Sequence, residues 1–559
     1  MSSTPPSPRT RRDRRSPGAR PLPPLSRVLR LGRPSDIWFK PALSVVVAVL
    51  PPNLTLMALG RLDLAMYTMA GSLCALYAHQ LPYAARARAL AWVVLGMLSG
   101  VAVALVTASL TDSAAVLVLV GALLAAAQKT LTDATRIGPP GPVIFAFISS
   151  ASLFVPQTLG QVPAHLGLAA AAGVWAWLVG MAPGLVRPHG PERRATARAL
   201  HAAAAYARTR GTEEGHEAAR AAAAAAVHAA WQTLLATGAR SEPRRALERL
   251  VVRAEVALAA PTDTDHALLR TWARDLRGNG PVPAVAPLPA DDELLGVEAE
   301  LAEPRTPLLR RLGPLWPLAL RTALGCALAG WASLALGVGR PYWALVTAAS
   351  LYQANIASTW SRAVQRVVGN VLGVLLFAAV APLAHLGQAA LVLCCVAFNF
   401  GAEALIARNY WLGSVCVTPM ALLITEFTGY TEPGGLMADR VVDTLVGALV
   451  GFVAAVAVTN RRAGDRVGAA LDTVERARER AARVLAARHP EPGALESARR
   501  ALTAALVDLR ATVDAAAGEW WQRALPQERV VAAEQSGHRT LAATVRRQQG
   551  PRTSEGTPA

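Results

Sequence analysis

Long apolar stretches follow one another in two groups along the chain. The first group lies within residues 37–187 and the second within 313–460. A helix needs about 20 apolar residues to cross the ~30 Å hydrocarbon core of a bilayer, where it satisfies its own backbone hydrogen bonds. Each group holds about six such stretches. The pattern predicts an all-α, polytopic membrane protein with spans near 38–53, 63–80, 90–110, 114–131, 142–157, 164–186, 315–337, 341–358, 367–384, 387–406, 410–428 and 440–459.

The two groups resemble each other. The segment LAMYTMAGSL at 64–73 aligns with WALVTAASL at 343–351, and at the same offset Arg88 falls on Arg366. Because an even number of spans separates equivalent positions, both groups point the same way, which predicts two parallel six-helix transmembrane repeats. Arginines gather in alternate connections, and the positive-inside rule then places both termini and the central region in the cytoplasm of a multi-pass cell (inner) membrane protein.

The other regions are polar. Residues 1–36 are rich in proline, serine and arginine, which predicts a disordered basic arm, and 549–559 are expected to form a disordered tail. Residues 188–312 and 461–548 are rich in alanine and arginine and predict cytoplasmic helices. Within the first of these, 221–239 is nearly apolar enough to span, but His228 and Gln232 favour a helix outside the membrane.

The composition shows that the chain is strongly basic. Of 559 residues, 53% are hydrophobic and 17% charged, and the net charge is +18. Such a basic chain suggests a nucleic-acid partner, but loop arginines explain the excess, so no nucleic acid is expected. The lipid bilayer is the expected partner, and a homo-oligomer stays open.

Motifs for catalysis are missing from the sequence. The five cysteines lie in expected spans without CxxC spacing, so no metal site and no cofactor are expected. We find no catalytic residues and no nucleotide-binding loop in the sequence, which argues against an enzyme and against ATP-driven transport by this chain alone.

Polar residues within the second group carry the candidate chemistry, because a polar or charged side chain at membrane depth is costly and commonly lines a pathway. All but Asn399 have a second interpretation. Asn370 is then a contact between helices, and Glu403 a partner of Arg408. Arg440 and Asp443 form an ion pair at the outer interface, and Arg362 and Arg366 are topological anchors rather than an anion-attracting mouth. The transport-pathway candidates are Arg362, Arg366, Asn370, Asn399, Glu403, Arg440 and Asp443.

Residues 340–376, RPYWALVTAASLYQANIASTWSRAVQRVVGNVLGVLL, resemble the signature of the fusaric acid resistance (FUSC) family, which is related to the aromatic acid exporters. The matching positions are Tyr342, Trp343, Arg366 and the motif glycines Gly369 and Gly373. Asn370 stands where that family usually has threonine. The resemblance implies export of small organic acids, often aromatic carboxylic acids, driven by the proton gradient.

We therefore expect a secondary exporter of small organic anions, with intramembrane carboxylates able to carry a proton. Two alternatives remain. Plant malate channels are similar to one such membrane block, which keeps a passive organic-anion channel open. A membrane scaffold that binds a partner through 188–310 and moves no solute is the third interpretation.

Overall fold

The computed structural model describes residues 22–32, 37–135, 137–209, 216–236, 241–259, 264–278, 280–285, 308–353, 355–429, 432–458, 463–488, 493–517 and 526–549. Every regular element in these ranges is helical, so the prediction of an all-α fold is confirmed. The expected tail at 550–559 and most of the arm lie outside the described residues.

Eight helices of the described ranges are long and apolar enough to cross a membrane. Their outward faces carry large apolar side chains exposed to the surroundings, as a lipid contact requires. The eight are α2 (Phe39–Ala58), α4 (Tyr83–Leu110), α5 (Ala114–Thr135), α7 (Val162–Met181), α15 (Trp316–Ala335), α17 (Ile356–Ala384), α18 (Gln388–Ile406) and α20 (Pro433–Ala457).

The other four expected spans contain shorter apolar helices. They are Leu62–Leu76, which comprises η1 (Leu62–Leu64), α3 (Ala65–Ser72) and η2 (Leu73–Leu76), then α6 (Val143–Leu153), α16 (Tyr342–Leu351) and α19 (Tyr410–Thr425). After α19, η4 (Glu426–Thr428) continues to the end of the predicted span. All ten residues of α16 are buried. A helix that is apolar all round is also what a protein core needs, so burial among other helices explains the apolar sequence of α16 without contact with lipid.

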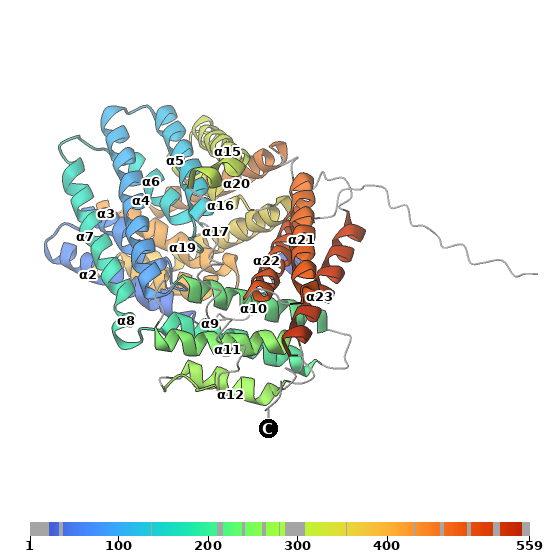
Figure 1. Cartoon of the computed structure of the whole chain (residues 1–559). Coiled ribbons are helices and arrows are strands. Elements are labelled where there is room, and N and C mark those ends of the chain that lie inside the picture. The colour runs from blue at the N-terminus through green and yellow to red at the C-terminus, as the bar shows by residue number, and fades with distance from the viewer. Residues whose placement is uncertain are drawn as a thin grey trace, which may run out of the picture.

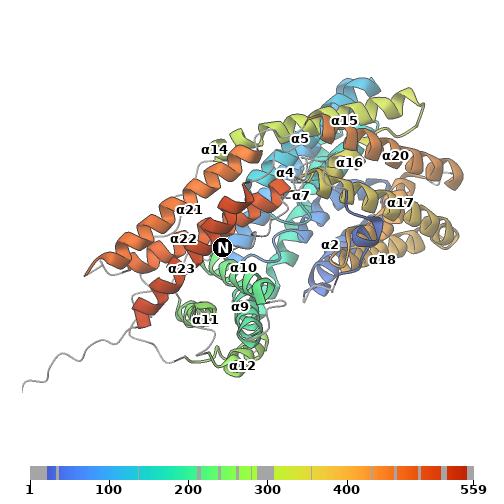
Figure 2. The ribbon, with the colours of Figure 1, turned by 90° about the vertical axis from the view of Figure 1, so that its right-hand side faces the viewer.

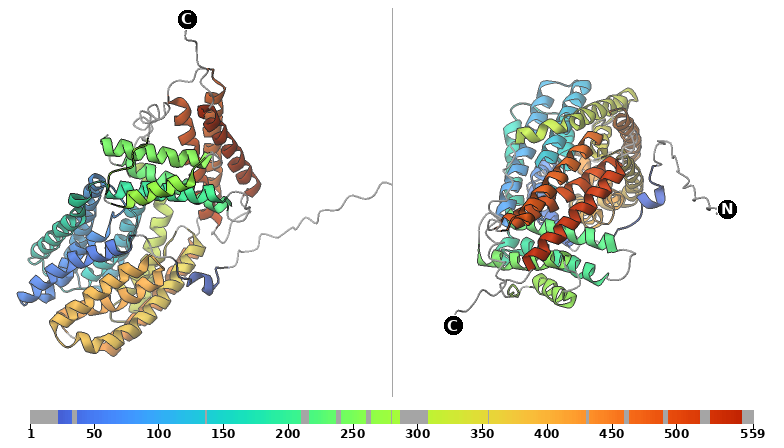
Figure 3. Two further views of the ribbon diagram at one scale, coloured as in Figure 1. Left: turned by 90° about the horizontal axis from the view of Figure 1, so that it is seen from below. Right: turned by 45° about the vertical axis from the view of Figure 1, so that its right-hand side comes forward.

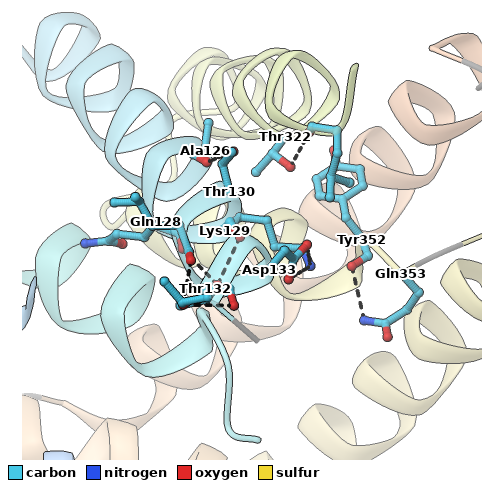
Figure 4. Close-up of polar contacts among 12 residues, drawn as sticks. Ala126, Gln128, Lys129, Thr130, Thr132, Asp133, Thr322, Tyr352 and Gln353 are labelled. Carbon is cyan, nitrogen blue, oxygen red and sulfur yellow. Dashed lines mark hydrogen bonds and ion pairs between the residues drawn. The ribbon is translucent and has the colours of Figure 1, made fainter. Parts of the chain in front are cut away.

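Some long helices include charged residues that the sequence had placed in connecting loops. Helix α4 begins at Tyr83 and α17 at Ile356, so Arg86 and Arg366 are buried helical residues and not loop residues. Arg88, which the alignment paired with Arg366, is exposed. Helix α5 runs on to Thr135, and Lys129 and Asp133 form an i,i+4 ion pair of 2.7 Å near its end. Figure 4 shows this pair beside Tyr352, where α16 has ended.

Each group has the same order of long and short helices: long, short, long, long, short, long. The contacts between the groups are reciprocal. The first helix of each group packs on the fourth helix of the other group. Thus α2 packs on α18, and α15 packs on α5. Figure 2 shows the pair α5 and α15 at one side and the pair α2 and α18 at the other.

Two further helical regions lie together at one end of the membrane helices (Figure 1). Each has its own hydrophobic core. They meet at Glu255, which accepts hydrogen bonds from Trp231 Nε1 at 2.7 Å and from Arg499 Nη2 at 2.5 Å. Their helices are α9 (Gly190–Arg208), α10 (His216–Leu235), α11 (Glu242–Ala259) and α12 (His266–Arg277) in the central region, and α21 (Ala463–Ala486), α22 (Ala494–Ala517) and α23 (Gln527–Gln549) in the C-terminal one. Helix α10 packs on α9 and α11, which fits the interpretation of 221–239 as a helix outside the membrane.

The end of the basic arm is ordered, which corrects the expectation of disorder for residues 22–32. This segment forms a short helix, α1 (Leu25–Val28), that lies against α17 (Figure 3). Its backbone carbonyls accept hydrogen bonds from side chains of the second group: Asn409 Nδ2 donates to Val28 and Arg30 at 3.1 and 3.0 Å, and Trp411 Nε1 donates to Leu29 at 3.1 Å. These donors fix a segment that has little apolar surface of its own to bury.

We expect the variant Asn409→Asp with Trp411→Phe to release this segment. The aspartate keeps the acceptor that caps α19 but loses the donor, and the phenylalanine keeps an aromatic ring but loses the N–H. Trypsin cleavage after Arg27 and Arg30, followed by mass spectrometry, should become at least several-fold faster, because proteolysis follows local opening. Trp331→Phe, which loses a bond to Ala115 O far from the arm, is the control. Equal cleavage of both variants would contradict the docking.

Candidate functional site

The interior of the second group holds a cluster of buried polar side chains. It is formed by α15, α16, α17, α19 and α20, whose buried faces meet in the interior. On α20, the buried positions 440, 443, 444 and 447 follow the i, i+3, i+4, i+7 spacing of one helix face. On α17, positions 366, 370, 373 and 377 are also buried and fall on one face. Helices α17 and α20 therefore each place a row of polar residues in the same interior.

Glycines allow these helices to approach closely. A Cβ atom added to Gly369 would lie 2.6 Å from the backbone oxygen of Trp411, and one added to Gly373 would lie 2.9 Å from that of Val415. Both distances are too short for a real Cβ contact, so α17 meets α19 at a separation that only glycine permits. Gly447 on α20 is equally close to Ala344 on α16.

We expect Gly369→Ala and Gly373→Ala to lower the melting temperature of the detergent-solubilised protein by several degrees. Overpacking of this kind costs roughly 1–3 kcal/mol. The matched control is Gly167→Ala in the interior of α7, where an added Cβ meets nothing within 4 Å, so that variant should hold or gain stability. Thermal unfolding of the three variants, followed by intrinsic fluorescence, tests the difference. A loss of stability as large in the control would contradict the packing argument.

Asn370 is at the centre of the cluster. It is 1% exposed, its Nδ2 donates to Thr444 Oγ1 at 3.0 Å, and its Oδ1 accepts from Thr418 Oγ1. The two threonines also bond to carbonyls of their own helices. Asn370 therefore links α17, α19 and α20, which supports the interpretation as a contact between helices, with one Nδ2 hydrogen left over for a further partner.

Two arginines flank Asn370 and are almost completely buried. Arg366, 3% exposed, donates from Nη1 to Tyr410 Oη at 3.0 Å, but its Nε has no hydrogen-bond partner among the described residues. Arg440, 1% exposed, lies with its guanidinium carbon 5.0 Å from the ring centroid of Trp343, and its Nε and Nη1 have no partner there either. Arg362, on the same helix as Arg366, stacks 3.9 Å over the ring of Tyr410.

One carboxylate accompanies these cations. Asp443 has no exposed surface, and its Oδ1 accepts from Ser333 Oγ at 2.5 Å, while Oδ2 has no partner in the described part of the chain. The described residues include no ion pair of 4 Å or less between Asp443 and Arg440. Both side chains are buried among the helices, and the direct ion pair of the alternative interpretation is not formed among the described residues.

The structure brings together five of the seven predicted pathway residues: Arg362, Arg366, Asn370, Arg440 and Asp443. The other two lie apart on α18. Asn399 donates to Cys395 O of its own helix at 3.0 Å. Glu403 is partly exposed and, within the described ranges, makes no ion pair with Arg408. Neither residue contributes a hydrogen bond to the cluster as far as the structure describes it.

Sequence reasoning missed several members of the cluster. Trp343 and Tyr410 stand at helix ends, where an aromatic belt at the membrane interface is the usual explanation. Trp343 is instead fully buried beneath Arg440, and its Nε1 has no partner among the described residues. Ser333 and Thr418 look like ordinary small helix residues. Thr444 had a signal, because it lies on the same helix face as Arg440, four residues away.

Comparison with known proteins places this cluster in a family. Residues 327–454 match the model of the fusaric acid resistance protein-like family. This segment of the chain is similar to that family. It runs from α15 to α20 and contains Ser333, Trp343 and the five clustered pathway residues. The resemblance seen in residues 340–376 is thus confirmed for the second group of helices.

Relatives extend the similarity beyond the FUSC-like segment. The chain is 26% identical over 454 residues to YvaC of Bacillus subtilis, described as an uncharacterized membrane protein, and the alignment covers 73% of this chain and 70% of YvaC. It is 30% identical over 148 residues to an uncharacterized protein of Haemophilus influenzae, covering 25% and 19% of the two chains. No solved structure matches the chain significantly. The chain is a polytopic, multi-pass membrane protein with a FUSC-like segment.

Proposed function

We propose that this protein is a secondary transporter that exports small organic anions, and that they bind in the FUSC-like segment between Arg366 and Arg440. The observation that carries the proposal is a set of buried N–H donors that have no hydrogen-bond partner among the described residues: Arg366 Nε, Arg440 Nε and Nη1, and Trp343 Nε1. A buried donor left unsatisfied costs about 1–3 kcal/mol, and more when it is charged. A carboxylate is acceptor-only and would satisfy these donors.

The charge balance of the cluster also favours an anion. The buried Arg366 and Arg440 and the partly buried Arg362 outnumber the buried carboxylate of Asp443 and the partly exposed Asp439 near it. Cations at membrane depth are expensive unless they have partners. Arginine binds carboxylates through paired, charge-assisted hydrogen bonds. The rings of Trp343 and Tyr410 stack with Arg440 and Arg362, and such surfaces suit an aromatic acid.

We propose that the proton gradient drives export, with Asp443 as the proton carrier. Its unpartnered Oδ2 is able to take up a proton, and the sequence has no nucleotide-binding loop. The proposed orientation keeps both termini and the region 188–312 in the cytoplasm. The location of α9–α12 and α21–α23 at the same end of the molecule supports this orientation.

We also propose that the two membrane domains, 37–187 and 313–460, are parallel repeats related by a twofold axis. Their common order of long and short helices and the reciprocal packing of α2 on α18 and α15 on α5 support the proposal. The separate hydrophobic cores of 188–312 and 461–548 support their treatment as individual domains. The cluster of buried charges described above lies in the second repeat, so that repeat carries the anion site.

Reconstitution into liposomes tests the transport function. The probe is labelled hydroxybenzoate, loaded at a pH where it is ionised, and its flux is followed with and without an imposed pH difference. The proposal expects flux that the pH difference accelerates. Flux that follows the membrane potential and ignores the pH difference would identify a passive channel. No flux above protein-free liposomes for a panel of aromatic and aliphatic acids would leave a scaffold as the better interpretation.

A further inference from the structure

A second group of cations lies outside the FUSC-like segment, where the first membrane domain meets α9. Lys40 from the start of α2 lies within electrostatic range of Arg86 from α4, Arg187 from the end of α8 (Pro183–Val186) and Arg194 from α9. These residues come from three parts of the sequence: the start of α2, the start of α4, and the connection from α8 into α9. Neither the match to the family nor the proposed pathway involves them.

The base of this group has buried donors without partners. Arg86 is 4% exposed, and its Nη2 lies 2.8 Å from His79 Nδ1. Because arginine only donates, His79 Nδ1 accepts and its Nε2 carries the hydrogen. Burial, and then the repulsion of Arg86, lower the pKa of His79 to about 3, so its ring is neutral. Arg86 Nε and His79 Nε2 are both buried donors without a hydrogen-bond partner in the described part of the chain.

The rim of the group is accessible. Lys40, Arg187 and Arg194 are half-buried. Arg194 Nε donates to Gly190 O at 3.0 Å, and a Cβ atom added to Gly190 would lie 3.6 Å from Arg194 Nη2 and 3.8 Å from the hydroxyl of Tyr83. Burial lowers the pKa of Arg194, and the nearby Arg187 and Arg198 add to that effect. The rim therefore presents closely spaced cations that repel one another.

Counter-charge at the rim is small. Glu192 on α9 is near Arg194, but it is 3% exposed and lies 3.9 Å from His189. Arg187 Nη2 also donates to the carbonyls of Arg277 and Gly278 at the end of α12, which holds its side chain in place. Among the described residues, one carboxylate against four cations leaves an excess of positive charge that an anion would offset.

The surroundings indicate which anion. Leu185 and Val186, next to Arg187, are 90% and 80% exposed, and Trp38 and Phe39, next to Lys40, are exposed as well. Exposed aliphatic and aromatic side chains beside cations at the end of membrane helices are typical of the boundary between lipid tails and headgroups. A soluble anion needs the cations but has no use for these apolar neighbours.

We propose that Lys40, Arg86, Arg187 and Arg194 form a binding site for the phosphate group of an anionic membrane lipid, whose acyl chains lie along Leu185 and Val186. The buried Arg86 and the N–H of His79 form the floor of the site and the other cations its rim. Bound lipid would fasten α9, and with it the helices outside the membrane, to the first membrane domain.

Native mass spectrometry of the full-length protein, delipidated in detergent and titrated with phosphatidylglycerol or phosphatidylcholine, tests the site. The wild type should bind the first lipid and not the second. Lys40→Gln with Arg194→Gln should weaken phosphatidylglycerol binding about tenfold or more, since each cation near a charged headgroup contributes appreciably. Lys40→Arg with Arg194→Lys keeps the charges and should restore binding.

The matched control is Arg88→Gln with Arg208→Gln, which removes two exposed cations from the same helices, α4 and α9, and should leave binding unchanged. Equal weakening in this control would reduce the effect to overall charge and overturn the site. Full lipid binding by the Lys40 and Arg194 variant, with an unchanged elution volume, would also overturn it. A third arm adds inorganic phosphate: binding of phosphate with no gain from the lipid would overturn the assignment to lipid.

Discussion

Replacing Arg440 with glutamine should reduce the initial rate of hydroxybenzoate flux by about 100-fold, because the loss of a charged partner in a desolvated site costs roughly 2–5 kcal/mol. Arg440 supplies two of the unpartnered donors of the cluster and lies over Trp343. The glutamine fits in the space of the arginine and makes no new contact that would block a pathway. The loss should appear at every substrate concentration at which the wild type is far from saturation.

The control for this experiment is Arg408→Gln, which removes an exposed arginine at the end of α18 and should transport at the wild-type rate. Equal flux from the Arg440→Gln and wild-type proteins, at equal protein density in the liposomes, would exclude Arg440 from anion binding. Arg440→Lys separates charge from shape. It keeps a cation but loses the planar fork, so a rate between the two is expected.

The number and positions of the apolar helices could be predicted from the sequence, because hydrophobicity of the length of a span is a strong signal. Which of them cross the membrane could not. Residues 341–358 are as apolar as a true span, yet α16 ends at Leu351 and is buried on every side. A run of apolar residues indicates that the helix is shielded from water. Both lipid and the protein interior shield a helix in this way, so the run does not tell which of them surrounds it.

The charged residues of the candidate site could be predicted from the sequence. Arg366, Arg440 and Asp443 were singled out because charges inside a span are costly. The neutral residues of the cluster could not be predicted. Ser333 and Thr418 cost little free energy inside a membrane helix, so nothing distinguishes them from other small helix residues. Glu403 shows the limit of the same rule. It satisfies the same rule as Asp443, but it lies on α18, away from the polar stripes of α17 and α20, and sequence spacing within one helix does not tell which helix it faces.

Replacing Asp443 with asparagine should abolish the acceleration of flux by a pH difference while leaving some flux down the concentration gradient. The amide oxygen is still able to accept the hydrogen bond from Ser333 Oγ, so the fold of the cluster is kept, but the side chain no longer takes up or releases a proton. The measurement is the ratio of initial hydroxybenzoate rates with and without an imposed pH difference. A value well above one in the wild type should fall to about one, since coupling to protons requires a group that titrates.

Two further amides make this result specific. Asp439→Asn changes the same chemical group one helical turn earlier on α20, where the side chain is partly exposed, and should retain the wild-type ratio. Glu403→Gln should retain it too, because Glu403 lies on α18, apart from the cluster. A lost response in Glu403→Gln and a normal one in Asp443→Asn would move the proton carrier to α18 and away from the arginines. A normal response in both would remove intramembrane carboxylates from the mechanism, and the anion would then have to move without the proton.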